Sequence, residues 1–185
     1  MAVIYTKRFA LRPITEDDAP VFARLCNDET IARNTARIPH PYTIENAVAF
    51  TRYAVSAVAE KHEYHFAVCE DDEIIGRCGV MRDNDDWEIG YWVAAAARGN
   101  GVATEIAGAT TQFAIEALQA KIVTAGYFFD NPASAKVLEK LGFRATGESR
   151  EIFSLGRDCT VETPQMTLRA TDFLRPEAVR INTAR

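Results

Sequence analysis

The 185-residue sequence lacks the run of about 20 apolar residues that a membrane span requires. Its first residues also lack the apolar core of a secretory signal peptide. We therefore expect a cytoplasmic protein that makes no contact with a membrane. Positive charge is scarce, because 21 Lys and Arg stand against 26 Asp and Glu, for a formal net charge of -5. Proteins that bind nucleic acid typically carry a basic surface, so this balance argues against nucleic acid as a partner.

Cysteine is also scarce, and its spacing excludes two kinds of site. The four cysteines include no C-x-x-C pair and no His at ligand spacing, so we expect no structural zinc and no disulfide framework. We interpret them as small buried hydrophobic residues. No repeat, linker or low-complexity stretch divides the chain, and its length is that of one domain. We therefore expect residues 1–185 to form a single domain without a metal.

The most informative segment is an apolar strand that runs through a Gly-rich turn into a helix, between Tyr91 and Glu105. The two glycines of the turn allow a tight bend and let the backbone come close to a ligand. Consecutive N–H groups there, with the free N–H groups of the helix start, form a cradle for a phosphate or pyrophosphate. Arg98 adds a positive charge at the rim. The residues expected to bind a phosphorylated cofactor here are Trp92, Val93, Arg98, Gly99, Asn100, Gly101, Val102, Ala103 and Thr104.

Two common Gly-rich patterns do not match this turn. A P-loop has four residues between its glycines and then Lys-Ser or Lys-Thr, none of which is present. The dinucleotide fingerprint has a third Gly or Ala where this chain has Thr104, and it sits in a βαβ unit. The turn therefore predicts neither an NTPase nor a dinucleotide-binding protein.

The turn instead resembles that of the GNAT acetyltransferase superfamily, through Arg98, Gly101 and Ala103 in the pattern Arg-x-x-Gly-x-Ala. The segment 128–143, with its Asp-Asn-Pro start and Gly-Phe end, is similar to a second GNAT motif. The segments 10–19 and 41–47 resemble the Rim-type branch, and the resemblance covers a core of about residues 7–170. It implies acetyl-CoA as co-substrate, with its pyrophosphate on the turn and its pantetheine arm against Asn131 and Ser134. It also implies a protein N-terminal α-amine as the acceptor, bound near the loop between the first two helices.

Local patterns predict an α/β sandwich, a mixed and mostly antiparallel twisted sheet flanked by helices, as the resemblance also implies. Thr15 and Thr43 have the position of helix N-caps, as does Asn131 with Pro132 behind it, and Gly142 has that of a helix stop. Acidic turns separate three alternating apolar runs, as in hairpins. Strands are expected at 65–69, 74–81, 87–93, 121–129, 145–155 and 159–169, with one more near residue 10; helices are expected after 15, 43, 101 and 131.

Two residues are candidates for catalysis. Glu88, on the strand before the turn, is suited to take a proton from the acceptor amine, or else is a solvent-facing strand residue. Many GNAT enzymes place a Tyr where this chain has Leu138, to protonate the departing CoA thiolate. Ser134 is the nearest donor, one turn earlier on the same helix face. Alternatively, Ser134 only hydrogen-bonds the pantetheine or the start of its own helix.

The Asp83–Asp86 cluster lacks the Gly and distal Glu of a calcium loop, so it is interpreted as a solvated hairpin turn.

Three alternatives for function stay open at this point. The acceptor is either a protein N-terminus or a small amine such as a drug, polyamine or amino acid. A catalytically silent acyl-CoA sensor would keep the cradle without chemistry. The oligomeric state is open, a homodimer included.

Overall fold

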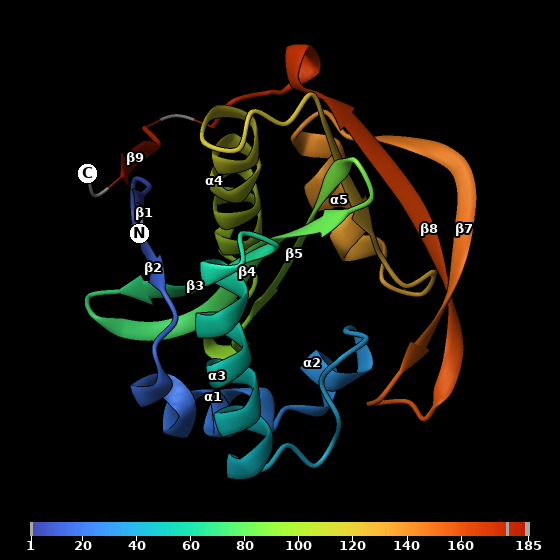
Figure 1. The fold of residues 1–185 in the computed structure, drawn as a ribbon. Coiled ribbons are helices and arrows are strands. Elements are labelled where there is room, and N and C mark those ends of the chain that lie inside the picture. Colours follow the sequence, from blue (N-terminus) through green and yellow to red (C-terminus); the bar gives the residue numbers. More distant parts are fainter. Residues whose placement is uncertain (1, 177, 184–185) are drawn as a thin grey trace.

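A single mixed sheet organises the fold in the computed structural model, which describes residues 2–176 and 178–183. Within these residues the sheet has nine strands in the order β7-β8-β6-β5-β4-β3-β2-β1-β9 (Figure 1). The strands are β1 Ala2–Tyr5, β2 Ala10–Pro13, β3 Glu63–Glu70, β4 Glu73–Asp83, β5 Asp86–Val93, β6 Ile122–Gly126, β7 Arg144–Ser154, β8 Cys159–Arg169 and β9 Arg180–Thr183. The helices are α1 Ala19–Cys26, α2 Glu29–Arg33, α3 Ile44–Ala59, α4 Val102–Glu116 and α5 Pro132–Lys140, with short 3₁₀ turns at Glu16–Asp18, Ala95–Ala97 and Ala170–Asp172.

Every strand pair is antiparallel except β5 with β6. The predicted fold class, a mixed and mostly antiparallel sheet flanked by helices, is therefore confirmed. Figure 1 shows β7 and β8 as a long hairpin at one end of the sheet, and the two chain ends close together at the other. No helix among the described residues is both long and apolar enough to cross a membrane.

The sheet buries both of its faces, because successive side chains of a strand point to opposite sides. On β3, Phe66 and Val68 pack into a core with α4 and α5. Between and beyond them, Ala67 and Cys69 pack into a second core with α1 and α3. The two faces of the sheet therefore carry separate hydrophobic cores.

The predicted helix caps at Thr43 and Asn131 are confirmed, whereas Thr15 precedes the 3₁₀ turn Glu16–Asp18 and α1 begins after Asp18. Thr43 Oγ1 accepts a hydrogen bond from Asn46 N at 3.4 Å at the start of α3, and the side chain of Asn131 caps α5. Gly142 follows the end of α5 with a φ of +95°, the left-handed conformation that glycine adopts most easily. The predicted strands and their hairpins also form, including the turn between Asp83 and Asp86.

The sequence pattern does not predict β1, β9 or α2. β1 and β9 have four residues each and pair with each other from opposite ends of the chain. The described residues beyond 170 lie outside the core of about 7–170 that the resemblance implies, yet they add β9 to the edge of the sheet. α2 has five residues, and its start is fixed by the side chain of Asp28, which accepts from the N–H groups of Thr30 and Ile31. Such short elements leave too few positions for a periodic pattern to be recognised.

Candidate active site

The parallel strands β5 and β6 form a fork. They pair at Trp87 with Val123 and at Glu88 with Thr124, and no further pair follows toward Val93. Beyond Glu88, β5 thus has unpaired backbone groups on its β6 side, which can hydrogen-bond an extended ligand as another strand would. β5 runs into the Gly-rich turn before α4, and β6 runs into α5, so both helices begin at the open end of the fork.

The Gly-rich turn has the geometry of an anion cradle. Gly99 and Gly101 have φ of +85° and +75°, and Gly101 is the N-cap of α4. A Cβ built on Gly99 would meet no atom within 4 Å, and one on Gly101 would meet only Arg8 Nη2 at 3.8 Å. The first backbone bond of this helix start is from Glu105 N to Gly101 O, and the N–H groups of 99–104 have no acceptor among the described residues. The turn therefore offers exposed donors at a helix N-terminus, which fits a pyrophosphate.

Two arginines lie at the cradle, one of them not predicted. The Arg98 guanidinium turns back, donating from Nε to Val93 O at 3.0 Å and pairing with Asp28 at 2.9 Å. Arg8, from the loop between β1 and β2, donates to Asn100 O at 3.0 Å and pairs with Glu105 at 2.8 Å. The sequence carries no local signal for Arg8, because 92 positions separate it from Asn100.

Most of the other predicted cofactor residues offer their main chain only. The Trp92 side chain is buried on the α1 side of the sheet, edge-on to Phe22 at 5.8 Å between ring centroids. Val93 and Val102 are buried in the core on the α4 side. Ala103 and Thr104 are half-buried in the first turn of the helix. At these positions a ligand can therefore use backbone N–H and C=O groups.

Asn131 and Ser134 lie at the start of α5, beside a residue that the sequence analysis missed. Asn131 Oδ1 accepts a hydrogen bond from Ser134 N at 3.3 Å. Ser134 Oγ lies 2.9 Å from Tyr91 Oη, so Tyr91 joins β5 to α5. Burial raises the pKa of Tyr91 to about 12, so the phenol keeps its proton at neutral pH and can donate it. The alternation of side chains along a strand indicates Tyr91, because it places residues 87, 89 and 91 on the same face of β5.

Glu88 reaches the fork from the other face of the sheet, the face of Trp92. Its side chain is half-buried, and Arg150 is its ion-pair partner at a long 3.9 Å. Burial, and then the nearby charge of Asp83, raise the pKa of Glu88, with Arg150 and Arg37 opposing the shift. A carboxylate that is costly to keep ionised binds a proton more readily, as a general base must.

Comparison with known proteins identifies the family. The profile of the Acetyltransferase (GNAT) domain family matches residues 8–144. The chain belongs to the GNAT family. It is 33% identical to the SPbeta prophage-derived uncharacterized N-acetyltransferase YokL of Bacillus subtilis, over 82% of this chain and 86% of that protein. It is therefore an N-acetyltransferase by family.

Two solved structures show the same GNAT fold. Mycobacterium smegmatis RimJ in complex with CoA-disulfide superposes with a TM-score of 0.81, at 18% identity, over 96% of this chain and 90% of that one. RimL, a ribosomal L7/L12 alpha-N-protein acetyltransferase in complex with coenzyme A, gives a TM-score of 0.80 at 13% identity, over 90% and 97%. The likeness to Rim-type enzymes that the sequence suggested is thus confirmed in the fold.

Residues 27–43, which we call the α1–α3 segment, place Ile31 and Tyr42 in the same core as Trp92, on the Glu88 face of the sheet. At its start Asp28 both caps α2 and pairs with Arg98, the arginine of the cradle. Burial opposes ionisation of Asp28, but hydrogen bonds from the Ile31 N–H and the charge of Arg98 hold its pKa below the usual value. The segment and the cradle are therefore joined through one carboxylate.

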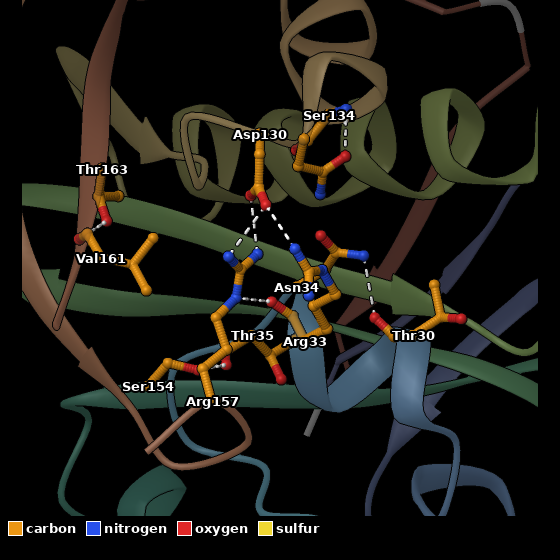
Figure 2. Close-up of polar contacts among 11 residues, drawn as sticks. Thr30, Arg33, Asn34, Thr35, Asp130, Ser134, Ser154, Arg157, Val161 and Thr163 are labelled. Carbon is orange, nitrogen blue, oxygen red and sulfur yellow. Dashed lines mark hydrogen bonds and ion pairs between the residues drawn. The ribbon is translucent and has the colours of Figure 1, made fainter. Parts of the chain in front are cut away.

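A second carboxylate, Asp130, fastens the α1–α3 segment to the loop that carries Asn131. Figure 2 shows Asp130 between two guanidinium groups. Arg33 donates to it at 3.0 Å, and Arg157 pairs with it through two hydrogen bonds, the shorter 2.7 Å. Arg157 also donates from Nε to Arg33 O at 2.7 Å. Hydrogen bonds from Arg157, and then from Arg33, hold the pKa of Asp130 below its usual value.

The hydroxyl pair of Ser134 and Tyr91 leads to a first prediction. If Ser134 protonates the departing thiolate, Ser134→Ala should lower kcat by about tenfold while the acetyl-CoA dissociation constant changes little. The effect is modest because a thiol of pKa about 8.5 is already a tolerable leaving group. Tyr91→Phe should have a smaller effect in the same direction, since it removes the hydroxyl that holds Ser134 Oγ.

Steady-state kinetics and calorimetry on both variants test this, with Ser149→Ala as the control. Ser149 lies on β7, and its hydroxyl donates to Glu162 at 2.9 Å, so the substitution removes a comparable bond elsewhere. A weaker affinity for acetyl-CoA with kcat unchanged would assign Ser134 to binding instead.

Proposed function

We propose that this GNAT protein transfers an acetyl group from acetyl-CoA directly to the α-amine of a protein N-terminus. The observation that carries the proposal is the fork between β5 and β6, with an anion cradle at its mouth and different chemistry on its two faces. Bound acetyl-CoA would supply the thioester whose acetyl group is transferred. The proposal includes a single domain over residues 1–185 and a cytoplasmic location.

The chain's own groups have separate tasks in this scheme. The N–H groups of residues 99–104 hold the pyrophosphate, and Asn131 with Ser134 contacts the pantetheine arm. An N–H group of β5 beyond Glu88 donates to the thioester carbonyl, which stabilises negative charge as it develops on the oxygen. Glu88 accepts the proton of the amine on the opposite face. Most of the rate gain comes from holding the two reactants in line.

The cysteines support direct transfer rather than a covalent acyl-enzyme. Burial raises the pKa of Cys26 to about 12 and that of Cys78 to about 11, and it raises the pKa of Cys69 as well. These thiols are therefore protonated at neutral pH and poor nucleophiles. Cys159 is exposed at the start of β8, outside both cofactor motifs.

An N-terminal acceptor fits the proton chemistry. An α-amine has a pKa near 8, so about a tenth is neutral at pH 7, against about one in several thousand for lysine. One half-buried carboxylate is then a sufficient base. RimL, a ribosomal L7/L12 alpha-N-protein acetyltransferase, shares the fold, which supports the same acceptor class.

The deciding experiment measures CoA release from acetyl-CoA with a defined set of amines. Peptides with a free α-amine should be acetylated, and the same peptides with a blocked α-amine and a free lysine should not. Faster reaction with polyamines, amino acids or drug-like amines would show a small-amine acetyltransferase instead. Acetyl-CoA binding without release on any amine would show an acyl-CoA sensor.

A further inference from the structure

The hydroxyl of Thr124 is buried and has no hydrogen-bond partner among the described residues. Among the described residues, four buried side-chain atoms are in this state: Glu63 Oε2, His65 Nε2, Arg77 Nε and Thr124 Oγ1. The first two face each other at 2.8 Å, so each has a polar neighbour. A buried hydroxyl without a partner is unfavourable, so its partner is expected to come from outside the chain.

Thr124 lies beside Glu88 at the point where the fork opens. The two residues form the last pair of the β5–β6 ladder, and paired residues of neighbouring strands point to the same face. The Glu88 carboxylate also has free capacity, because its ion-pair contact with Arg150 is 3.9 Å long. Thr124 and Glu88 therefore lie side by side on one face of the sheet, and both carry hydrogen-bonding capacity that the described residues leave unused.

We propose that Thr124 Oγ1 and the Glu88 carboxylate together bind the water molecule through which the acceptor amine loses its proton. This rests on the proposed function. The ammonium N–H bond breaks and its proton passes to the water, which gives a proton to Glu88. Glu88 becomes a carboxylic acid, and the amine keeps the electron pair that attacks the thioester. Thr124 acts as a positioning residue, because it holds the water and exchanges no proton itself.

Thr124→Val tests the role of the hydroxyl, since it keeps the shape and the β-branching of the side chain. The hydroxyl has no partner in the part of the chain that the structure describes, so the variant should melt no lower than the wild type. We expect kcat for N-terminal peptides to fall about tenfold at pH 7, with the acetyl-CoA dissociation constant unchanged. Thr167→Val is the matched control, because Thr167 pairs with Thr124 on the next strand, β8. It should retain wild-type kcat.

A pH profile separates positioning from a structural role. Asp83 on β4, Arg150 on β7 and Arg37 of the α1–α3 segment act on the pKa of Glu88 through their charges, and the variant leaves all three unchanged. A water held by Thr124 favours the ionised carboxylate, so Thr124→Val should move the acid limb of kcat/KM to higher pH. An unchanged acid limb with kcat equal to that of Thr167→Val would overturn the proposal.

A double-mutant cycle distinguishes failure of the role proposed for Thr124 from failure of the proposed function. If Thr124 acts through the water on Glu88, adding Thr124→Val to Glu88→Gln should cause no further loss. Independent, multiplying losses would contradict the shared water. If Glu88→Gln itself retains full activity, the base assignment fails instead. If the wild type acetylates no amine, the proposed function fails before the cycle is measured.

Discussion

Glu88→Gln is expected to lower kcat for N-terminal peptides by about 100-fold at pH 7, the lower range for loss of a general base. The loss should be smaller at pH 9, where about nine-tenths of an α-amine is already neutral. Kinetics at the two pH values with one peptide measure the difference. An equal loss at both would assign Glu88 to binding or structure.

The thermal stability of Glu88→Gln serves as a control for these kinetic measurements. Burial raises the pKa of Glu88 in the folded state, so the folded chain holds this proton more tightly than the unfolded chain. Protonated Glu88 thus contributes stability at pH values below its pKa in the unfolded state. This contribution is lost as the pH rises through its raised pKa in the folded state. At pH 7 the ionised carboxylate is the costly form, and Glu88→Gln should melt no lower than the wild type.

Asp83→Asn should lower the pKa of Glu88, the opposite of the shift expected for Thr124→Val. Asp83 helps to raise the pKa of Glu88 and also pairs with Arg150 at 2.7 Å. Removing its charge ends one repulsion and frees Arg150 to approach Glu88. Both effects should lower the pKa of Glu88, so the acid limb of kcat/KM should move to lower pH. An unmoved limb would mean that another group controls it.

The parts of the fold that the sequence predicts correctly depend on neighbours within a few residues. Thr43 and Asn131 cap helices because their side chains reach N–H groups three positions ahead. Gly99 and Gly101 have positive φ in the turn that the sequence predicts to be a ligand cradle. Local chemistry of this kind is visible in a single sequence.

The parts that it misses depend on partners far along the chain. The sequence predicts Arg98 at the cradle rim, but it carries no signal that the guanidinium pairs with Asp28, 70 positions away. Arg8 and Tyr91 likewise reach the site only through tertiary packing. Thr124 carries no motif, and its place beside Glu88 follows from how β6 docks on β5. No local sequence pattern predicts the register in which β6 pairs with β5.

The cradle gives the sharpest test of the cofactor site, through Gly101→Ala. A Cβ at this position would point into open space beside Arg8, at the N–H groups that are proposed to hold the pyrophosphate. We expect the acetyl-CoA dissociation constant to rise at least tenfold, equivalent to about 1.4 kcal/mol of binding free energy. Valine would confuse the result, because a β-branched residue is poorly tolerated at a φ of +75°.

Gly147→Ala is the matched control for Gly101→Ala. Gly147 has a φ of +82°, and a Cβ there would meet nothing within 4 Å, but it lies in β7. Both variants should lose about 1 kcal/mol of stability to the left-handed backbone, measured by thermal melting. In calorimetry, acetyl-CoA affinity should fall in Gly101→Ala alone. S-acetylpantetheine lacks the pyrophosphate, so both variants should use it as the wild type does. If Gly101→Ala binds acetyl-CoA with wild-type affinity, the turn is not the pyrophosphate site.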